Sequence, residues 1–396
     1  MKITSVECYL GDFITVKVNT DEGISGFGEA GLSYGNSQEA AFGQCQDYAK
    51  LVLGMDPFDS EKIWNHLFRD TFWAMGGGAV TSAAMAAIDT ACWDIKGKAL
   101  NLPVHKLLGG KTNDKLRAYA SQLQFGWRKL IEAADNLTVL YDPEDYYKVV
   151  KEAVDEGYDA VKIDPVFAPY KEKPVPEVFA TQGTHIRGWM RQHDVKRCVE
   201  RIAAAREAGG PDMDIIVEIH SLLDANTASE FGKALEPYNI MYYEEPTMPA
   251  NPNMFKVIKD GCTLPLATGE RSYTRWGFRQ FFEDRTLSIV QPDLCNTGGI
   301  SETKKIADMA LVYDVGVQIH ICGGPIATAA GLQVEAVIPN FVIHEEHNAN
   351  LLTKFKKAGK YFYEPKNGSY EVPDLPGIGQ EMSEEAMATA KKVVIK

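Results

Sequence analysis

Three glutamates recur at one interval in the middle of the chain and could together hold a divalent cation. Glu218, Glu244 and Glu270 stand 26 and 26 residues apart, and each follows a short apolar run. Neighbouring strands of a parallel sheet lie ~4.8 Å apart, so carboxylates one repeat apart converge at one end of the sheet. Three like charges so close need a cation, and an all-oxygen set favours Mg²⁺ over zinc. The spacing predicts one Mg²⁺ per active site; the alternative is three unrelated carboxylates, each paired with a surface lysine.

The residues that could move protons follow the same and the next apolar runs. Asp293 and His320 end two neighbouring runs, and an aspartate that binds one imidazole nitrogen leaves the other nitrogen more basic. His220 comes two residues after Glu218, so on a strand or its extension it points the same way. Glu345 ends the last run and is a candidate to face the substrate, although a solvated loop carboxylate fits the sequence almost as well. These residues predict acid–base chemistry beside the metal.

Three basic residues could bind an anionic substrate near this cluster. Lys162 lies at the end of the second apolar run, where it could contact a substrate carboxylate or be an ordinary strand-end lysine. Arg271 directly follows Glu270, and Arg187 lies in a longer segment. Both arginines are candidate substrate clamps, with structural or solvated ion pairs as the alternative.

The elements that must position these residues read as a repeating β/α pattern. Short apolar strands alternate with helix-length segments such as 196–208 and 301–312. Eight buried strands in such a series predict a (β/α)8 barrel, and no G-x-G-x-x-G follows an early strand as an open doubly wound sheet of the dinucleotide-binding type would need. The eight predicted strands are 116–120, 160–163, 215–219, 240–243, 264–268, 287–290, 315–319 and 341–343.

The segments outside the barrel predict a second, α+β domain. We expect strands and a hairpin turn at 21–23 before residue 29, then helices, including one over 80–99. After the barrel we expect a hairpin around Asn367-Gly368, from 361–363 to 370–372, and a final helix over 383–392. The predicted division is a capping domain at 1–112, the barrel at 113–350, and a C-terminal segment at 351–396 that returns to the cap.

Two segments of the cap and one insert are expected to border the site. Residues 32–36, with Tyr34 as a candidate substrate contact, and residues 72–75 should close the barrel mouth. Trp73 is expected to pack rather than to touch substrate. The insert at 165–194 follows a barrel strand and should overhang the site.

Composition excludes several classes of protein. The chain has 396 residues, 54 acidic and 41 basic, for a net charge of −13, whereas nucleic-acid binding needs a clustered basic face. No stretch approaches the ~20 apolar residues that span a bilayer, and the first residues do not read as a signal peptide. Seven scattered cysteines without a C-x-x-C pair indicate buried thiols. We expect a cytoplasmic protein that binds neither nucleic acid nor membrane.

Taken in order, these motifs resemble the enolase superfamily, and specifically its mandelate racemase-like, acid-sugar dehydratase branch. The resemblance covers almost the whole chain. The motifs that carry it are Asp21-Glu22-Gly23, Gly26-Phe27-Gly28-Glu29, Trp93-Asp94-Ile95-Lys96-Gly97-Lys98, Leu108-Gly109-Gly110-Lys111, Glu244-Glu245-Pro246, Thr268-Gly269-Glu270-Arg271, Gln291-Pro292-Asp293, the stretch from His320 to Pro325, and Pro373 to Gly379.

The resemblance implies a reaction that starts at the carbon next to a carboxylate. A base, His320 with Asp293, removes the C2 proton, and Mg²⁺ offsets the charge of the enediolate, as is general in this superfamily. In galactonate- and gluconate-type dehydratases a histidine at the position of His220 protonates the departing 3-hydroxyl. The expected reaction is dehydration of a sugar acid such as galactonate or gluconate to a 2-keto-3-deoxy acid. Members of the family are commonly homo-oligomers.

Two departures from the branch bear on the substrate. Racemases of the branch show Lys-x-Lys where this chain has Lys162-Ile163-Asp164, which weakens a two-base racemase and leaves Asp164 as a candidate substrate contact. Glu218 stands where many relatives have aspartate, and its longer side chain could move metal or substrate. The alternatives are an epimerase or cycloisomerase acting on a sugar acid or its lactone, and a catalytically silent sugar-acid-binding paralogue.

Overall fold

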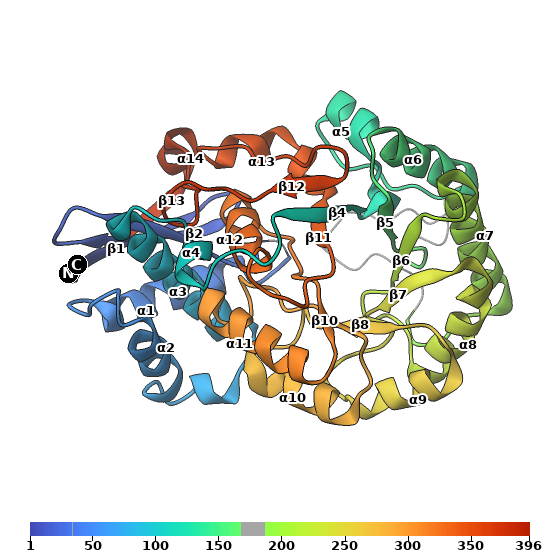
Figure 1. Ribbon diagram of the computed structural model, residues 1–396, viewed down its shortest axis with the longest axis horizontal. Helices are drawn as coiled ribbons and strands as arrows, with labels where there is room; N and C mark the ends of the chain where they lie inside the picture. The colour runs from blue at the N-terminus through green and yellow to red at the C-terminus, as the bar shows by residue number, and fades with distance from the viewer. Residues whose placement is uncertain (34, 168–186) are drawn as a thin grey trace.

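The computed structural model describes residues 1–33, 35–167 and 187–396. Figure 1 shows a cap and a barrel packed side by side, with both chain ends at the outer edge of the cap. Within the described ranges no helix is both long and apolar enough to cross a membrane. The predicted contacts of Tyr34 and of most of the 165–194 insert lie outside the described residues.

The cap is built on a four-stranded antiparallel sheet. Its first three strands follow one another as a meander: β1 (Ile3–Leu10), β2 (Ile14–Thr20) and β3 (Ser25–Ala30). The predicted turn between the last two lies at 21–23, where Gly23 takes a φ of 76°. The fourth strand, β13 (Lys391–Ile395), comes from the far end of the chain and pairs with β1.

Helices cover one face of this sheet, and the closest contact is made by glycine. A Cβ atom at Gly28 of β3 would lie 1.8 Å from the carbonyl oxygen of Ala87. Only glycine therefore allows the helix that carries Ala87 to approach the strand so closely. The cap helices are α1 (Gln38–Val52), α2 (Ser60–Arg69), the 3₁₀ turn η1 (Ala74–Gly76), α3 (Ala79–Leu100) and α4 (Val104–Leu107).

The barrel is a ring of parallel strands in chain order. Seven strands pair in sequence, and the last of the ring, β11, pairs with the first, β4. Residues just before β11 complete the ring, because Phe341 forms a parallel bridge with Val317 of β10. The strands are β4 (Lys115–Ser121), β5 (Ala160–Ile163), β6 (Asp214–Glu218), β7 (Ile240–Glu244), β8 (Leu266–Thr268), β9 (Ile289–Val290), β10 (Gly316–Val317) and β11 (His344–His347).

Helices surround the ring, as the apolar strands and amphipathic segments predict. The α-helices of the barrel are α5 (Arg128–Ala134), α6 (Pro143–Asp155), α7 (Gln192–Gly209), α8 (Ala225–Leu235), α9 (Asn253–Gly261), α10 (Thr274–Asp284), α11 (Gly299–Val312) and α12 (Pro325–Glu335). Two short 3₁₀ turns, η2 (Leu123–Phe125) and η3 (Glu236–Tyr238), follow β4 and α8.

An apolar layer fills the inside of the ring. Each strand from β4 to β9 contributes one buried side chain to it, and Ile343, just before β11, adds another. The cluster is Tyr119, Ala160, Ile216, Tyr242, Ala267, Ile289 and Ile343. Close packing of this kind makes a barrel interior a solid core rather than a pore. The polar residues described below therefore lie on top of a packed apolar layer.

Three predictions of secondary structure are wrong. The eighth strand lies at 344–347 rather than 341–343. The predicted hairpin does not form: the turn at Asn367-Gly368 is present, but β12 (Ser369–Glu371) pairs antiparallel with β4 of the barrel. The last helix, α14 (Glu384–Thr389), is shorter than predicted, because 391–395 form β13. The 3₁₀ turn η4 (Asn348–Leu351) and the helix α13 (Thr353–Ala358) complete the elements.

Candidate active site

Three carboxylates meet at the C-terminal ends of neighbouring barrel strands. Glu218 and Glu244 are the last residues of β6 and β7, and they are direct partners in the parallel ladder. Glu270 follows β8, and one oxygen from each of the three lies within 4.8 Å of the others. The repeat of one strand and one helix thus brings the predicted ligands together at the end of the barrel where active sites of this fold lie.

A fully buried lysine lies among these carboxylates. Lys162 Nζ is 3.2 Å from Glu218 Oε2, 2.9 Å from Glu244 Oε1 and 2.8 Å from Glu345 Oε1. Burial opposes the charge of Lys162, but the three carboxylates together raise its pKa well above the ordinary value. Lys162 is therefore a cation at neutral pH, and it neutralises part of the negative charge of the cluster.

His220 is held by an aspartate on the neighbouring strand. Its Nδ1 lies 2.6 Å from Asp164 Oδ2, and its Nε2 lies 3.4 Å from Glu218 Oε1. Asp164 is itself fixed by the backbone N–H groups of Val166 and Phe167, both at 2.8 Å. Burial lowers the pKa of His220, but Glu218 and Asp164 more than offset this and raise it to about 9. Asp164 therefore orients His220, a role that the sequence analysis did not assign to it.

The backbone at His220 is also unusual. Its φ is 48°, in the left-handed region that few residues other than glycine adopt. Strain of this kind is common where a side chain must be aimed at a site. The turn directs the imidazole back toward Glu218, so the two residues face the same space although the strand has already ended.

His320 repeats this arrangement on the other side of the cluster. Its Nδ1 lies 2.7 Å from Asp293 Oδ2, and its Nε2 lies 3.0 Å from Glu270 Oε2. Burial lowers the pKa of His320, but Glu270 and Asp293 raise it well above the ordinary value. Asp293 in turn accepts a 2.8 Å hydrogen bond from the backbone N–H of Cys295. The predicted histidine–aspartate pair is present, with its second ring nitrogen turned to the carboxylates.

Glu345 lies inside the barrel rather than in a solvated loop. Besides Lys162, its carboxylate accepts hydrogen bonds from Ser121 Oγ at 2.6 Å and from the backbone N–H of Ile321 at 3.1 Å. Burial raises the pKa of Glu345, but Lys162 and His320 outweigh it and lower the pKa. Glu345 is thus an ionised, fully paired carboxylate that joins Lys162 to the segment after His320.

Residues after the first barrel strand also join the site, and the sequence analysis missed them. Gln122 Nε2 donates to Glu218 Oε2 at 2.9 Å, and Gln124 Oε1 accepts from the backbone N–H of Asp164 at 3.1 Å. Both are buried. Their position directly after an apolar strand of a barrel was the available signal, because every such strand ends at the same face.

Several predicted contacts lie elsewhere or are already engaged. The Arg271 guanidinium pairs with Glu245 and with Glu270. Arg187 is exposed. The prediction that Trp73 packs into the molecule is wrong, because this side chain is 82% exposed; its ring meets that of Phe72 edge-on.

The donor set of the cluster fits a hard divalent cation. Among the described residues, none donates a hydrogen bond to Glu218 Oε1 or Glu244 Oε2, although both oxygens are buried; His220 Nε2 approaches the first only at 3.4 Å. Buried polar atoms rarely lack a partner, and a set of carboxylate oxygens without nitrogen or sulfur donors suits Mg²⁺. Burial, together with the charge of Glu218, raises the pKa of Glu244 to about 8, although Lys162 opposes the shift.

Two family models together cover most of the chain. "Mandelate racemase / muconate lactonizing enzyme, N-terminal domain" matches residues 1–109, and "Enolase C-terminal domain-like" matches residues 145–386. The chain belongs to the mandelate racemase/muconate lactonizing enzyme family of the enolase superfamily. The resemblance seen in its motifs is thereby confirmed, as is the barrel with an α+β cap.

Relatives within the enolase superfamily narrow the reaction. The chain is 32% identical to D-galactonate dehydratases of Pectobacterium atrosepticum and Variovorax paradoxus, over 99% of this chain and 95% of theirs. A crystal structure of an enolase-superfamily member from Salmonella Typhimurium is 48% identical and superposes with a TM-score of 0.94 over 100% of both chains. The chain is accordingly a dehydratase, that is, a hydro-lyase.

Proposed function

We propose that this enzyme removes water from a sugar acid, such as galactonate or gluconate, to form a 2-keto-3-deoxy acid, and that it requires Mg²⁺. Glu218, Glu244 and Glu270 would hold the ion. When bound, Mg²⁺ supplies the positive charge that offsets the negative charge of the substrate carboxylate as its neighbouring carbon loses a proton. The dehydratase relatives support the substrate class.

One observation carries the proposal: two histidine–aspartate pairs face the same carboxylate cluster. His220 Nε2 reaches toward Glu218, and His320 Nε2 reaches toward Glu270. In each pair the aspartate accepts a hydrogen bond from the Nδ1–H group and so fixes the orientation of the ring. The other nitrogen, Nε2, can then face the substrate. A β-elimination needs one group that takes a proton and one that gives a proton, and the site provides both.

In the proposed reaction His320 is the base. Its Nε2 takes the proton from C2 of the acid, and Asp293 keeps the ring oriented and stabilises the imidazolium that results. Lys162 lies between three carboxylates at the base of the site, where its fixed charge reduces the repulsion between these carboxylates and an anionic substrate. Removal of this proton is the difficult step, because a hydrogen next to a carboxylate is only weakly acidic.

His220 is the acid of the second step. Its Nε2 gives a proton to the 3-hydroxyl as the C3–O bond breaks, so that the group leaves as water. The electron pair from the C2–H bond forms the C2–C3 double bond, and the resulting enol becomes the 2-keto-3-deoxy acid when C3 takes up a proton. Neighbouring carboxylates raise the pKa of both histidines, so the acid and the base are assigned by the family resemblance and not by the pKa. A cation held by Glu270 would lower the pKa of His320 and so favour the neutral form that can take a proton.

The test is an assay of the purified protein on a library of aldonic and aldaric acids. With Mg²⁺ we expect at least one acid to yield a 2-keto product, detected as its semicarbazone, and with excess EDTA we expect none. Absence of a keto product from every acid, with metal bound, would sink the proposal. Net isomerisation in D2O with deuterium uptake and no keto acid would favour the epimerase or cycloisomerase; tight binding without turnover would favour the silent paralogue.

Two further predictions from the sequence stay predictions. These are the cytoplasmic location and the homo-oligomeric assembly that the family resemblance implies. Size-exclusion chromatography with light scattering would test the second.

A further inference from the structure

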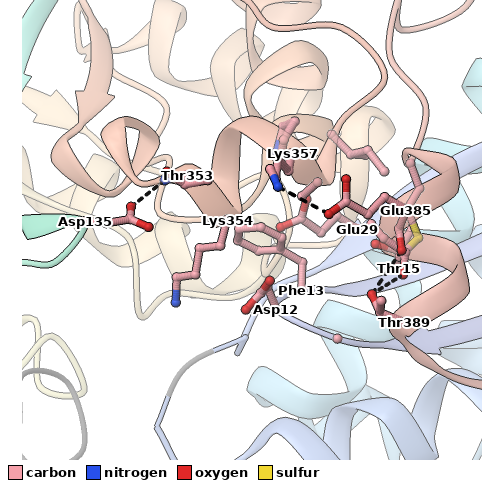
Figure 2. Close-up of a pocket in the computed structure, with 16 residues that line it drawn as sticks. Asp12, Phe13, Thr15, Glu29, Asp135, Thr353, Lys354, Lys357, Glu385 and Thr389 are labelled. Atoms are coloured by element: carbon pink, nitrogen blue, oxygen red, sulfur yellow. Dashed lines mark hydrogen bonds and ion pairs between the residues drawn. The ribbon is translucent and has the colours of Figure 1, made fainter. Parts of the chain in front are cut away.

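Two cavities meet at the tip of the first hairpin of the cap. The outer cavity has a volume of about 310 Å³ and is drawn in Figure 2; the inner cavity has about 250 Å³. Asp12, Phe13 and Lys354 line both of them. The turn between β1 and β2 therefore stands at the boundary between the two spaces.

The ring of Phe13 makes the boundary together with α13. It packs edge-on against Phe355, with 5.7 Å between ring centroids and an interplanar angle of 87°. On its other side it lies against the backbone of Gly324, where a Cβ atom would come within 2.8 Å of the ring. Phe13 is thus wedged between barrel residues, and Phe355 lines the inner cavity only.

The inner cavity is lined in part by residues that closely follow the site residues His320 and Glu345 in the chain. Its wall includes Cys322, two residues after His320, and His347, two residues after Glu345 on β11. The two side chains touch, with 3.4 Å between Cys322 Sγ and His347 Nε2. Because alternate residues of a strand face the same side, His347 and Glu345 both point into the barrel. The cavity therefore extends the site away from the metal ligands.

The remaining polar groups of the inner cavity suit a chain of hydroxyl groups. Ser33 and Asn136 can each donate and accept, Asp12 accepts and Lys354 donates. Figure 2 shows Asp12 and Lys354 next to the Phe13 ring. A polyhydroxylated carbon chain could bond to all of these groups until it reached the two aromatic rings, which offer no partner for a further hydroxyl.

We propose that the inner cavity holds the end of the sugar acid farthest from its carboxylate, and that Phe13, backed by Phe355, limits the length of acid that the enzyme accepts. This inference rests on the proposed function. Removal of the Phe13 ring would join the inner cavity to the outer one and make room for a longer chain.

The experiment compares aldonic acids of six, seven and eight carbons that share the configuration at C2 to C5. In the wild type we expect kcat/KM to fall at least about tenfold for each added carbon, the scale on which a closed pocket rejects one extra group. In Phe13→Ala and Phe355→Ala we expect the ratio of seven-carbon to six-carbon kcat/KM to rise about tenfold or more. Phe13→Leu, which keeps an apolar wall, should give an intermediate ratio.

A matched control is Phe58→Ala, since Phe58 is a cap residue, 40% exposed, that lines neither cavity. It should leave the length ratio as in the wild type. An equal ratio in wild type and Phe13→Ala, in protein whose circular dichroism shows it to be folded, overturns the inference. If no acid is turned over, the proposed function fails by itself, and the ratio is read from Kd by calorimetry with Mg²⁺; equal Kd ratios or no binding then overturn the length limit too.

Discussion

The same local geometry occurs twice in the site. An imidazole is held at Nδ1 by an aspartate, at 2.6 Å for His220 and 2.7 Å for His320, and its Nε2 faces a glutamate of the triad. The two histidines follow different strands, β6 and β10, and lie at opposite sides of the cluster, so one can face C2 and the other C3 of a bound acid. Single substitutions can separate the two roles.

His220→Asn tests the acid. We expect kcat for dehydration to fall ~10²–10⁴-fold, the usual contribution of a positioned proton donor, while exchange of the C2 proton with D2O continues because His320 is intact. The exchange is followed by NMR and the keto acid by colorimetry. His66→Asn, on the surface of α2 beside Asp70, is the control and should behave as the wild type. Unchanged dehydration in His220→Asn contradicts the assigned role.

Lys162→Met tests the counter-charge of the cluster. Loss of the ammonium group leaves Glu218, Glu244 and Glu345 without their shared partner, and breaking a buried ion pair costs roughly 3–5 kcal/mol. Urea unfolding in EDTA should show this loss, and the loss should be smaller in Mg²⁺. Lys256→Met removes a partly exposed pair with Asp284 and should cost less than ~1 kcal/mol. Equal effects of the two changes would argue against the counter-charge.

Among the site residues, the sequence predicted those whose places are set by the strand–helix repeat. It missed contacts that depend on a turn after a strand. Glu218, Glu244 and Glu270 were predictable because one strand and one helix fix their spacing. The pairing of Asp164 with His220 was not, since it depends on a left-handed backbone at His220 that histidine rarely adopts. Gln122 was missed because a glutamine near a strand end carries no chemical pattern of its own.

Among the elements, the junction between β3 and α12 ties the cap to the barrel. Glu29 of β3 is buried, and its carboxylate accepts hydrogen bonds from the backbone N–H of Gly324 at 2.5 Å and of Ala327 at 3.3 Å. These N–H groups lie at the start of α12, and the segment before them carries His320. Burial raises the pKa of Glu29 to about 8, although the two N–H groups oppose the shift.

This raised pKa makes stability depend on pH in a defined window. Between the ordinary pKa of 4.5 and about 8, folded Glu29 binds a proton that the unfolded chain has released. The free energy of unfolding therefore falls as pH rises through this window, by up to about 1.4 kcal/mol per pH unit from this group.

Glu29→Gln should remove that dependence. Glutamine keeps an oxygen acceptor but cannot ionise, so the variant should gain stability relative to the wild type between pH 5 and pH 8. Urea unfolding at several pH values measures the difference. Glu39→Gln, at an exposed position of α1, is the control. A Glu29→Gln difference that stays constant with pH would show that Glu29 does not titrate in this window.

The errors in the predicted elements also have physical causes. The apolar run 341–343 predicts the eighth strand, whereas the ladder to β4 is formed by His344-Glu345-Glu346-His347. Four polar residues in a row do not read as a buried strand, and here each finds a partner inside the protein: His344 Nδ1, for example, lies 2.5 Å from Glu335 Oε2. The polarity of these four residues predicts an exposed segment, but their partners in the folded protein allow them to form a buried strand.

In the whole molecule, the end of the chain adds one strand to each sheet. β12 adds to β4 of the barrel and β13 adds to β1 of the cap, and Figure 1 shows both termini at the outer edge of the cap. The number of barrel strands and the presence of a cap followed from the sequence, because short apolar runs recur at a regular interval. These two late pairings did not, since each joins residues from distant parts of the chain and no local pattern specifies such partners.

The distribution of the molecule's cysteines provides a single preferred site for labelling with a thiol reagent. Six of its seven cysteines are buried, whereas Cys322 is partly exposed and lines the inner cavity. A small thiol-directed fluorophore should consequently attach at Cys322 before any other position, without engineered substitutions. Its emission would report when a ligand enters the cavity, so binding could be followed by light even for acids that the enzyme does not convert.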